Sequence, residues 1–89
     1  MSYLLSHFWP GGTEEQYHAT AAAATEAAGG SLPETFHAAC VTDAGVLIVA
    51  TYESEEVAHR FIQGTLMPLM PIQGGLVGPP EERAGQNLR

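Results

Sequence analysis

The chain has 89 residues, 45% of them hydrophobic and 15% charged, and so has the size of one small domain. Ten acidic residues against three basic ones give a formal net charge of −7. This balance excludes nucleic acids and anionic membrane surfaces as partners, because phosphate binding needs clustered cations. The sequence shows no apolar stretch of membrane-spanning length and no basic-then-apolar leader, and Cys40 has no second cysteine to pair with. We therefore expect a single cytoplasmic domain over residues 1–89.

The first predicted element is a strand over residues 2–9, SYLLSHFW, which Pro10 and the glycines after it bring to an end. Successive side chains of a strand point to opposite faces of its sheet. Both faces of this strand carry bulky residues, so we expect both to be covered. One face has Tyr3, Leu5, His7 and Trp9, and the other has Leu4, Ser6 and Phe8.

A helix is predicted over residues 13–30, with clear signals at both ends. Thr13 and Gln16 have the spacing of a capping box, and Gly29 suits the position just after the last turn. Tyr17 and the alanines at positions 21, 24 and 28 form a stripe of very small volume. The helix therefore either packs close against its sheet or leaves a space, and the sequence favours neither alternative.

The rest of the chain predicts two strands, a second helix and an edge strand. The strands cover residues 35–42 and 46–53, and the turn between them ends at Gly45, which is free to take a positive φ. Ser54 caps a helix over 55–64, and the following residues add one more turn before Pro71. The tail is expected to form an edge strand. The residues of the second helix expected to face inward are Val57, Ala58, Phe61 and Ile62.

The predicted order β-α-β-β-α-β indicates an α+β fold of the ferredoxin-like type, in which two helices cover one face of an antiparallel sheet. The opposite face of the sheet is also apolar, and a chain of this size buries little surface by itself. We expect the sheet of an identical subunit to cover this face, which makes the protein a homodimer.

Four segments resemble the small dimeric α-β barrel proteins of actinomycetes, which are related to the antibiotic-biosynthesis monooxygenases. They are HFWPGGTEEQY, FHAA, ESEE with the amphipathic helix after it, and the pattern GTLMPLM…GG…PPE…NL. The resemblance spans nearly the whole chain. It implies two protomers packed sheet against sheet, with a ligand cavity between sheet and helices or near the dimer contact. The superfamily includes monooxygenases, haem degraders, polyketide cyclases and lactone isomerases, so the resemblance implies the fold more specifically than the activity.

The catalytic residues of individual branches do not carry over to this chain. Haem-degrading members use a Trp and a His of the second helix, and this chain has Phe61 at the position of the Trp and Pro71 near the position of the His. A polyketide cyclase of the same fold uses a Tyr and a His there, matched here by Phe61 and Met67. The quinone-forming monooxygenases use Asn, Trp, Tyr and Arg groups. The residues of this chain that could replace them are Asn87, Trp9 and Arg60, and none of these lies at a matching position. We therefore expect no haem and no flavin.

His37 and His7 are the candidate acid–base residues. His37 lies near the start of the second strand among small residues, and His7 shares a strand face with Trp9. A histidine can exchange a proton near neutral pH without a large perturbation. The alternative for each is a structural histidine held by a backbone carbonyl or by water. A shared metal would need a third ligand that the spacing does not supply, so no metal site is predicted.

Two tyrosines and three other aromatic residues complete the predicted pocket. Tyr52 and Tyr17 are candidate donors of a hydrogen bond to a substrate carbonyl, with ordinary packing at an element end as the alternative. We expect Trp9, Phe36 and Phe61 to form aromatic walls.

The remaining cysteine and histidines are given structural or surface roles. Cys40 has the strand parity opposite to His37 and is expected to be a small buried residue. His18 and His59 lie on the predicted helices and are expected at the surface.

Three hypotheses for function follow from these residues. The first is a small cofactor-independent enzyme of secondary metabolism that acts on an aromatic or polyketide-like substrate, either as a monooxygenase-like enzyme or as a cyclase or isomerase. The second is a non-catalytic protein that binds a small hydrophobic or aromatic ligand in the same pocket. The third is an assembly dimer whose core is packed shut. An open pocket with convergent His and Tyr side chains favours the first hypothesis, and a sealed core favours the third.

Overall fold

Four strands pair into one antiparallel sheet in the computed structural model, which describes residues 2–88. The sheet order is β2-β3-β1-β4, so β3 separates β1 from β2 and the C-terminal strand β4 forms an edge, as predicted. This α+β arrangement is compatible with a ferredoxin-like fold. The strands are β1 (Tyr3–Pro10), β2 (Glu34–Val41), β3 (Gly45–Tyr52) and β4 (Glu81–Gln86).

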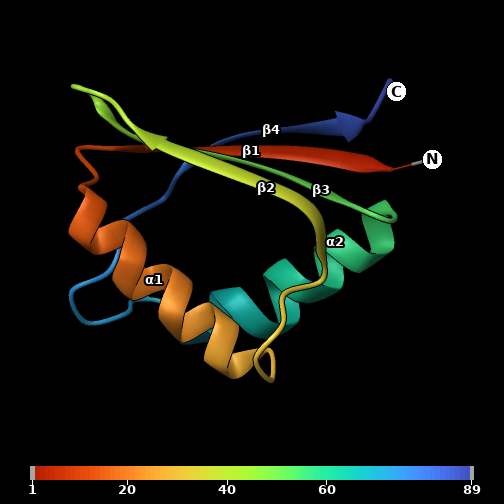
Figure 1. The fold of residues 1–89 in the computed structure, drawn as a ribbon, viewed down its shortest axis with the longest axis horizontal. Helices are drawn as coiled ribbons and strands as arrows, with labels where there is room; N and C mark the ends of the chain where they lie inside the picture. Colours follow the sequence, from red (N-terminus) through yellow and green to blue (C-terminus); the bar gives the residue numbers. More distant parts are fainter. Residues whose placement is uncertain (1, 89) are drawn as a thin grey trace.

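The helical segments all lie on one face of the sheet (Figure 1). Helix α1 covers Glu14–Ala27 and α2 covers Glu55–Phe61. The predicted helix over 55–64 continues past α2 as a wider π-helical turn, η1 (Ile62–Leu66), and then as the short α3 (Met67–Leu69). No helix of residues 2–88 is long and apolar enough to cross a membrane.

The predicted ends of α1 are confirmed. The Oγ1 atom of Thr13 accepts from the backbone N–H of Gln16 at 3.2 Å, and the side chain of Gln16 accepts from the backbone N–H of Thr13 at 3.0 Å. At the other end, Gly29 has φ +83° and donates to the carbonyl of Glu26. Gly29 thus has the left-handed backbone conformation that ends many helices and that glycine adopts more readily than other residues.

A β-bulge in β2 decides which of its side chains face the helices. Glu34 pairs with Tyr52 and Phe36 pairs with Thr51, so Thr35 is an extra residue on β2 between two consecutive pairs. In a regular strand, residues three apart point to opposite faces. The extra residue reverses this parity, and Glu34 therefore faces the helices together with His37.

The two faces of the sheet differ in their cover. On the helical face, Leu5, Trp9 and Tyr52 are buried. On the other face, the large apolar side chains remain partly exposed, and 56% of the surface of Phe36 is exposed to solvent. Cys40 is exposed as well, which corrects the prediction of a buried cysteine, because it lies on the outer face of the edge strand β2. The half-buried residues of this outer face include Leu4, Phe8, Leu47 and Val49.

Candidate functional site

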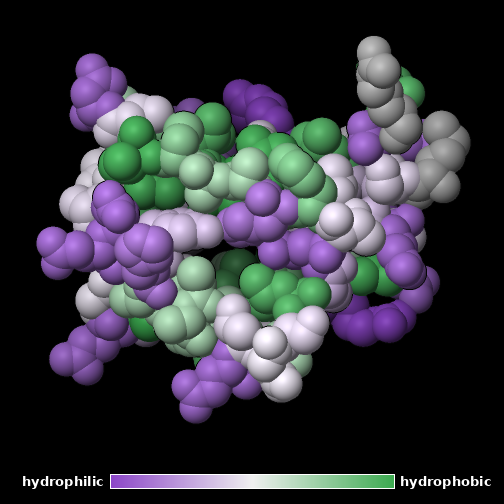
Figure 2. Space-filling model, viewed as in Figure 1, coloured by the Kyte–Doolittle hydropathy of each residue, from purple (hydrophilic) through white to green (hydrophobic). Residues whose placement is uncertain are grey.

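A cavity of about 70 Å³ lies between the sheet and the helices. In Figure 2 the surface is hollowed between the sheet layer and the helical layer. On the helix side the cavity is lined by Ala21 and Ala24, whose small side chains leave room that larger residues would fill. The alanine stripe was expected either to pack close against the sheet or to leave a space, and the structure shows a space. The sheet contributes apolar walls from Leu5, Trp9, Ile48 and Ala50, and the second helical segment adds Phe61, Ile62 and Leu66.

The loop before β4 closes one part of the cavity. Leu76, which is 1% exposed, donates its backbone N–H to the Oγ1 atom of the buried Thr20 at 2.8 Å. This bond joins the loop to the middle of α1. The bond gives a partner to the buried backbone N–H of Leu76, which lies in a loop and so has no partner within a helix or sheet.

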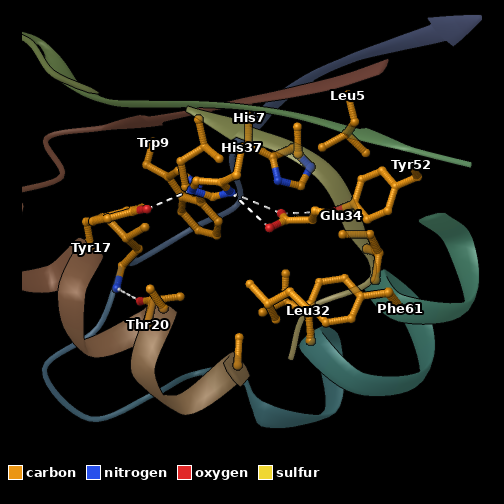
Figure 3. Close-up of a pocket in the computed structure, with 17 residues that line it drawn as sticks. Leu5, His7, Trp9, Tyr17, Thr20, Leu32, Glu34, His37, Tyr52 and Phe61 are labelled. Carbon is orange, nitrogen blue, oxygen red and sulfur yellow. Dashed lines mark hydrogen bonds and ion pairs between the residues drawn. The ribbon is translucent and has the colours of Figure 1, made fainter. Parts of the chain in front are cut away.

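A hydrogen-bonded chain of side chains runs along the cavity from α1 to the end of β3 (Figure 3). The Tyr17 hydroxyl lies 2.7 Å from Nε2 of His37, and Nδ1 of His37 lies 3.0 Å from Oε1 of Glu34. The Tyr52 hydroxyl donates to Oε2 of Glu34 at 3.4 Å. Two phenols, an imidazole and a carboxylate are thus connected across three elements of the fold.

The direction of these hydrogen bonds follows from the chemistry of the groups. A carboxylate can only accept, so Nδ1 of His37 donates its proton to Glu34. Burial, with a smaller contribution from the charge of Glu34, raises the pKa of Tyr17 above the ordinary value for tyrosine, so its phenol keeps its proton. The phenol donates to Nε2 of His37, which carries the lone pair of a neutral imidazole. His37 is therefore arranged as a base whose basic nitrogen is turned toward Tyr17.

The positions of Glu34 and His37 differ in their access to solvent. The side chain of Glu34 is only 10% exposed, whereas that of His37 is 31% exposed. Burial, the nearby charge of Glu34 and the hydrogen bond to it raise the pKa of Tyr52, so this phenol is also protonated near neutral pH. Both side chains line the cavity, and the more exposed imidazole is held in place by the less exposed carboxylate.

A second histidine faces the same cavity from β1. His7 is 7% exposed, and its Nε2 atom lies 2.7 Å from Oε2 of Glu82 on the neighbouring strand β4. Glu82 keeps 51% of its side chain exposed, so this pair connects the cavity wall to solvent. The indole of Trp9 packs edge-on against the His7 ring, and its buried Nε1 atom has no hydrogen-bond partner within residues 2–88.

The structure brings six of the seven predicted site residues to this cavity and leaves one outside it. Phe36, predicted as an aromatic wall, lies on the opposite face of the sheet and is 56% exposed, because its strand position alternates with that of His37. His18 and His59 are exposed, as predicted. The residues that line the cavity are His7, Trp9, Tyr17, His37, Tyr52 and Phe61.

Two carboxylates of this site were missed by the sequence analysis. Glu34 follows Pro33 at the start of β2, and the usual alternation places it away from His37; only the bulge reverses this. Glu82 is one of two adjacent glutamates, and the register of β4 on β1, which pairs it with His7, selects it for the helical face. No local sequence signal marks either choice.

Comparison of the chain with known protein families, with curated proteins and with solved structures finds no match. Within residues 2–88, no group of three or more His, Cys, Asp or Glu side chains is placed to hold a metal ion. The geometry itself defines an apolar cavity with two histidine–carboxylate pairs and two protonated phenols on its wall. Such groups can accept, donate and relay protons.

Proposed function

We propose that this protein is a small cofactor-independent enzyme that removes a proton from an aromatic or polyketide-like substrate bound in the cavity. The observation that carries the proposal is the chain Tyr17–His37–Glu34, in which a buried carboxylate orients an imidazole toward a phenol donor. This is the arrangement of a general base held in one tautomer by an acceptor on its far nitrogen. Deprotonation is the step from which both oxygenation and cyclisation or isomerisation of such a substrate can proceed.

A substrate can use both ends of the Tyr17–His37 hydrogen bond. When the acidic C–H or O–H group of the substrate approaches Nε2 of His37, it displaces the Tyr17 hydroxyl from that nitrogen. The freed hydroxyl can then donate to the carbonyl oxygen of the substrate, where negative charge develops as the proton leaves. Glu34 stabilises the imidazolium that forms, because its carboxylate accepts the hydrogen bond from Nδ1.

The size of the cavity favours a small ligand. Its volume of about 70 Å³ is well below the roughly 300–1,000 Å³ of sites that bind drug-sized molecules. A ring of five or six atoms with one carbonyl group is therefore a better probe than an extended polyketide. The same observation favours the second candidate function, a non-catalytic protein that holds a small apolar ligand.

Catalysed hydrogen–deuterium exchange tests the proposal. The α-protons of cyclopentanone are followed by NMR in D₂O, with and without the protein, and we expect the wild type to accelerate exchange above the buffer rate. His37→Ala is expected to lower this acceleration by about a hundred- to ten-thousandfold, the usual worth of general acid–base assistance. His18→Ala is the matched control, since His18 is an exposed histidine that lies outside the cavity. Binding of cyclopentanone without any acceleration of exchange would favour the ligand-binding candidate.

We also propose that the protein is a homodimer of the α-β barrel type and that it resides in the cytoplasm. The support for the dimer is the outer face of the sheet, where a row of apolar side chains crosses β1, β3 and β2 without cover from the helices. The residues of this row include Phe8, Leu47 and Cys40, which are aligned by the strand register. The support for the cytoplasm is the single cysteine of the chain, Cys40, which has no second cysteine to pair with, as is usual in a reducing compartment.

A further inference from the structure

The proposed reaction uses one histidine of the cavity, but the structure holds two, each with a carboxylate on one ring nitrogen. Glu34 accepts from Nδ1 of His37, whereas Glu82 pairs with Nε2 of His7. The opposite nitrogens differ in their surroundings. Nε2 of His37 accepts from the Tyr17 hydroxyl at 2.7 Å, whereas Nδ1 of His7 lies opposite the Glu82 contact. Among the described residues, no hydrogen bond is made by Nδ1 of His7, although the ring itself is buried and lines the cavity.

The sheet register fixes how far apart the two histidines stand. His7 pairs with Ile48 and His37 pairs with Ala50, so both lie on the helical face on either side of β3 and two residues apart along it. Strands about 4.8 Å apart and a rise of about 3.3 Å per residue separate their Cα atoms by about 12 Å. Both imidazoles line the same cavity, so a ligand held there can contact the two rings at once.

We propose that His7, positioned by Glu82, is the acid that works opposite the base His37, and that the enzyme therefore moves a proton within a small cyclic carbonyl compound. This inference rests on the proposed function of His37. It assigns the reaction to the isomerase class rather than to oxygenation, because a base and an acid on two sides of one ligand complete a proton transposition without an oxidant.

The step balances with a β,γ-unsaturated ketone as substrate. Nε2 of His37 takes a proton from the α-carbon, the C–H electron pair forms a new C=C bond, and the carbonyl π pair moves to oxygen. Nδ1–H of His7 gives its proton to that oxygen, which yields a dienol. The dienol then returns its O–H proton to His7 and takes the proton of His37 at the γ-carbon. The double bond has moved into conjugation, no atoms are gained or lost, and both histidines are restored.

Nε2 of His7 donates to Glu82, so a proton on Nδ1 requires the imidazolium form, which the adjacent carboxylate stabilises. Nε2 of His37 differs, because the Tyr17 hydroxyl donates to it and uses its lone pair. Glu82 of β4 is the charged group in contact with His7, and Glu82 is half exposed and can exchange protons with solvent. The other titratable side chains on the cavity wall are Tyr17 from α1, Glu34 and His37 from β2, and Tyr52 from β3. Helix α2 and the turn η1 present apolar side chains to the cavity. Glu82 is a positioning residue in this scheme, since it acts through His7.

The test follows the isomerisation of 3-cyclohexen-1-one to 2-cyclohexen-1-one by its ultraviolet absorbance, as a function of pH. Because the reaction needs one base and one acid, the wild-type rate is expected to pass through an optimum and to fall on both sides of it. His7→Gln is expected to lower the rate about a hundred- to ten-thousandfold and to remove the high-pH fall. Glu82→Gln keeps an acceptor for Nε2 but removes the charge, so the high-pH fall should begin at lower pH. His18→Gln is the control.

The outcomes separate this inference from the function on which it rests. If His37→Ala abolishes catalysis while His7→Gln and Glu82→Gln keep the wild-type rate and pH profile, the role of His7 is overturned and the role of His37 stands. If the wild type accelerates neither this isomerisation nor the exchange of cyclopentanone, both are overturned. Circular dichroism checks that His7→Gln folds. If it does not fold, the pH profile of Glu82→Gln, which changes the partly exposed member of the His7–Glu82 pair, decides the role of His7.

Discussion

The space beneath the alanine stripe of α1 can be tested by filling it. Ala21 is half-buried and lines the cavity, so an Ala21→Leu substitution places three additional carbon atoms into a volume of about 70 Å³. Cavities in protein cores cost about 24 cal/mol per Å³, and filling this one is therefore worth at most about 1.7 kcal/mol. Leucine is nearly as good a helix former as alanine, so little of this gain is lost to helix propensity.

Chemical denaturation and thermal melting of the same variant measure the effect. We expect Ala21→Leu to raise the free energy of unfolding by about 1–1.7 kcal/mol, which corresponds to roughly 4–14 °C in Tm for a domain of this size. The variant should also lose the NMR shifts that cyclopentanone induces in the wild type. Ala22→Leu is the matched control, because it makes the same change on the exposed side of the helix. A loss of more than about 1 kcal/mol in Ala21→Leu, with the control unchanged, would mean that the core is already full and would refute the cavity.

Three further predictions concern Tyr52, the hydrogen bond between Thr20 and Leu76, and the outer face of the sheet. Because burial raises the pKa of Tyr52, the unfolded chain releases this proton first; stability should therefore be unaffected below about pH 10 and should fall above it. Urea titrations from pH 8 to pH 11 should show a shallower fall in Tyr52→Phe, and an identical fall would contradict the assignment. Thr20→Val should lose about 1–3 kcal/mol by leaving the N–H of Leu76 unsatisfied, whereas Thr20→Ser should keep most of the stability in the same melts. Leu47→Glu should convert the dimer into a monomer in analytical ultracentrifugation, and a wild type that is already monomeric at micromolar concentration would remove the proposed dimer.

The elements of this fold could be predicted because their signals are local. The capping box at Thr13, the glycine that ends α1 and the serine before α2 each depend on a few adjacent residues. Strand alternation likewise indicated that His7 and Trp9 share one face, and both line the cavity. These features were readable because the physical cause of each lies within one turn or one strand.

The site was less predictable because it depends on pairing between strands. Phe36 and His37 are neighbours on one strand and cannot both face the cavity, and only the structure shows that Phe36 is the residue that faces away. Glu34 joins His37 only through the bulge at Thr35, which has no distinct sequence signal. The register of an edge strand, which selects Glu82, depends on contacts remote in the sequence.

The energetics of Glu34 bear on why the network exists at all. Its carboxylate is 10% exposed, and a buried charge loses the hydration that stabilises it in water. Hydrogen bonds from His37 and Tyr52 offset part of this cost, but buried ionic groups are often no more stabilising than apolar residues of the same size. Much of the surrounding wall is apolar, since Leu32, Phe61 and Ile62 line the same cavity. We infer that a small domain with a thin core keeps this network for the proton it can move, because stability alone does not require a carboxylate there.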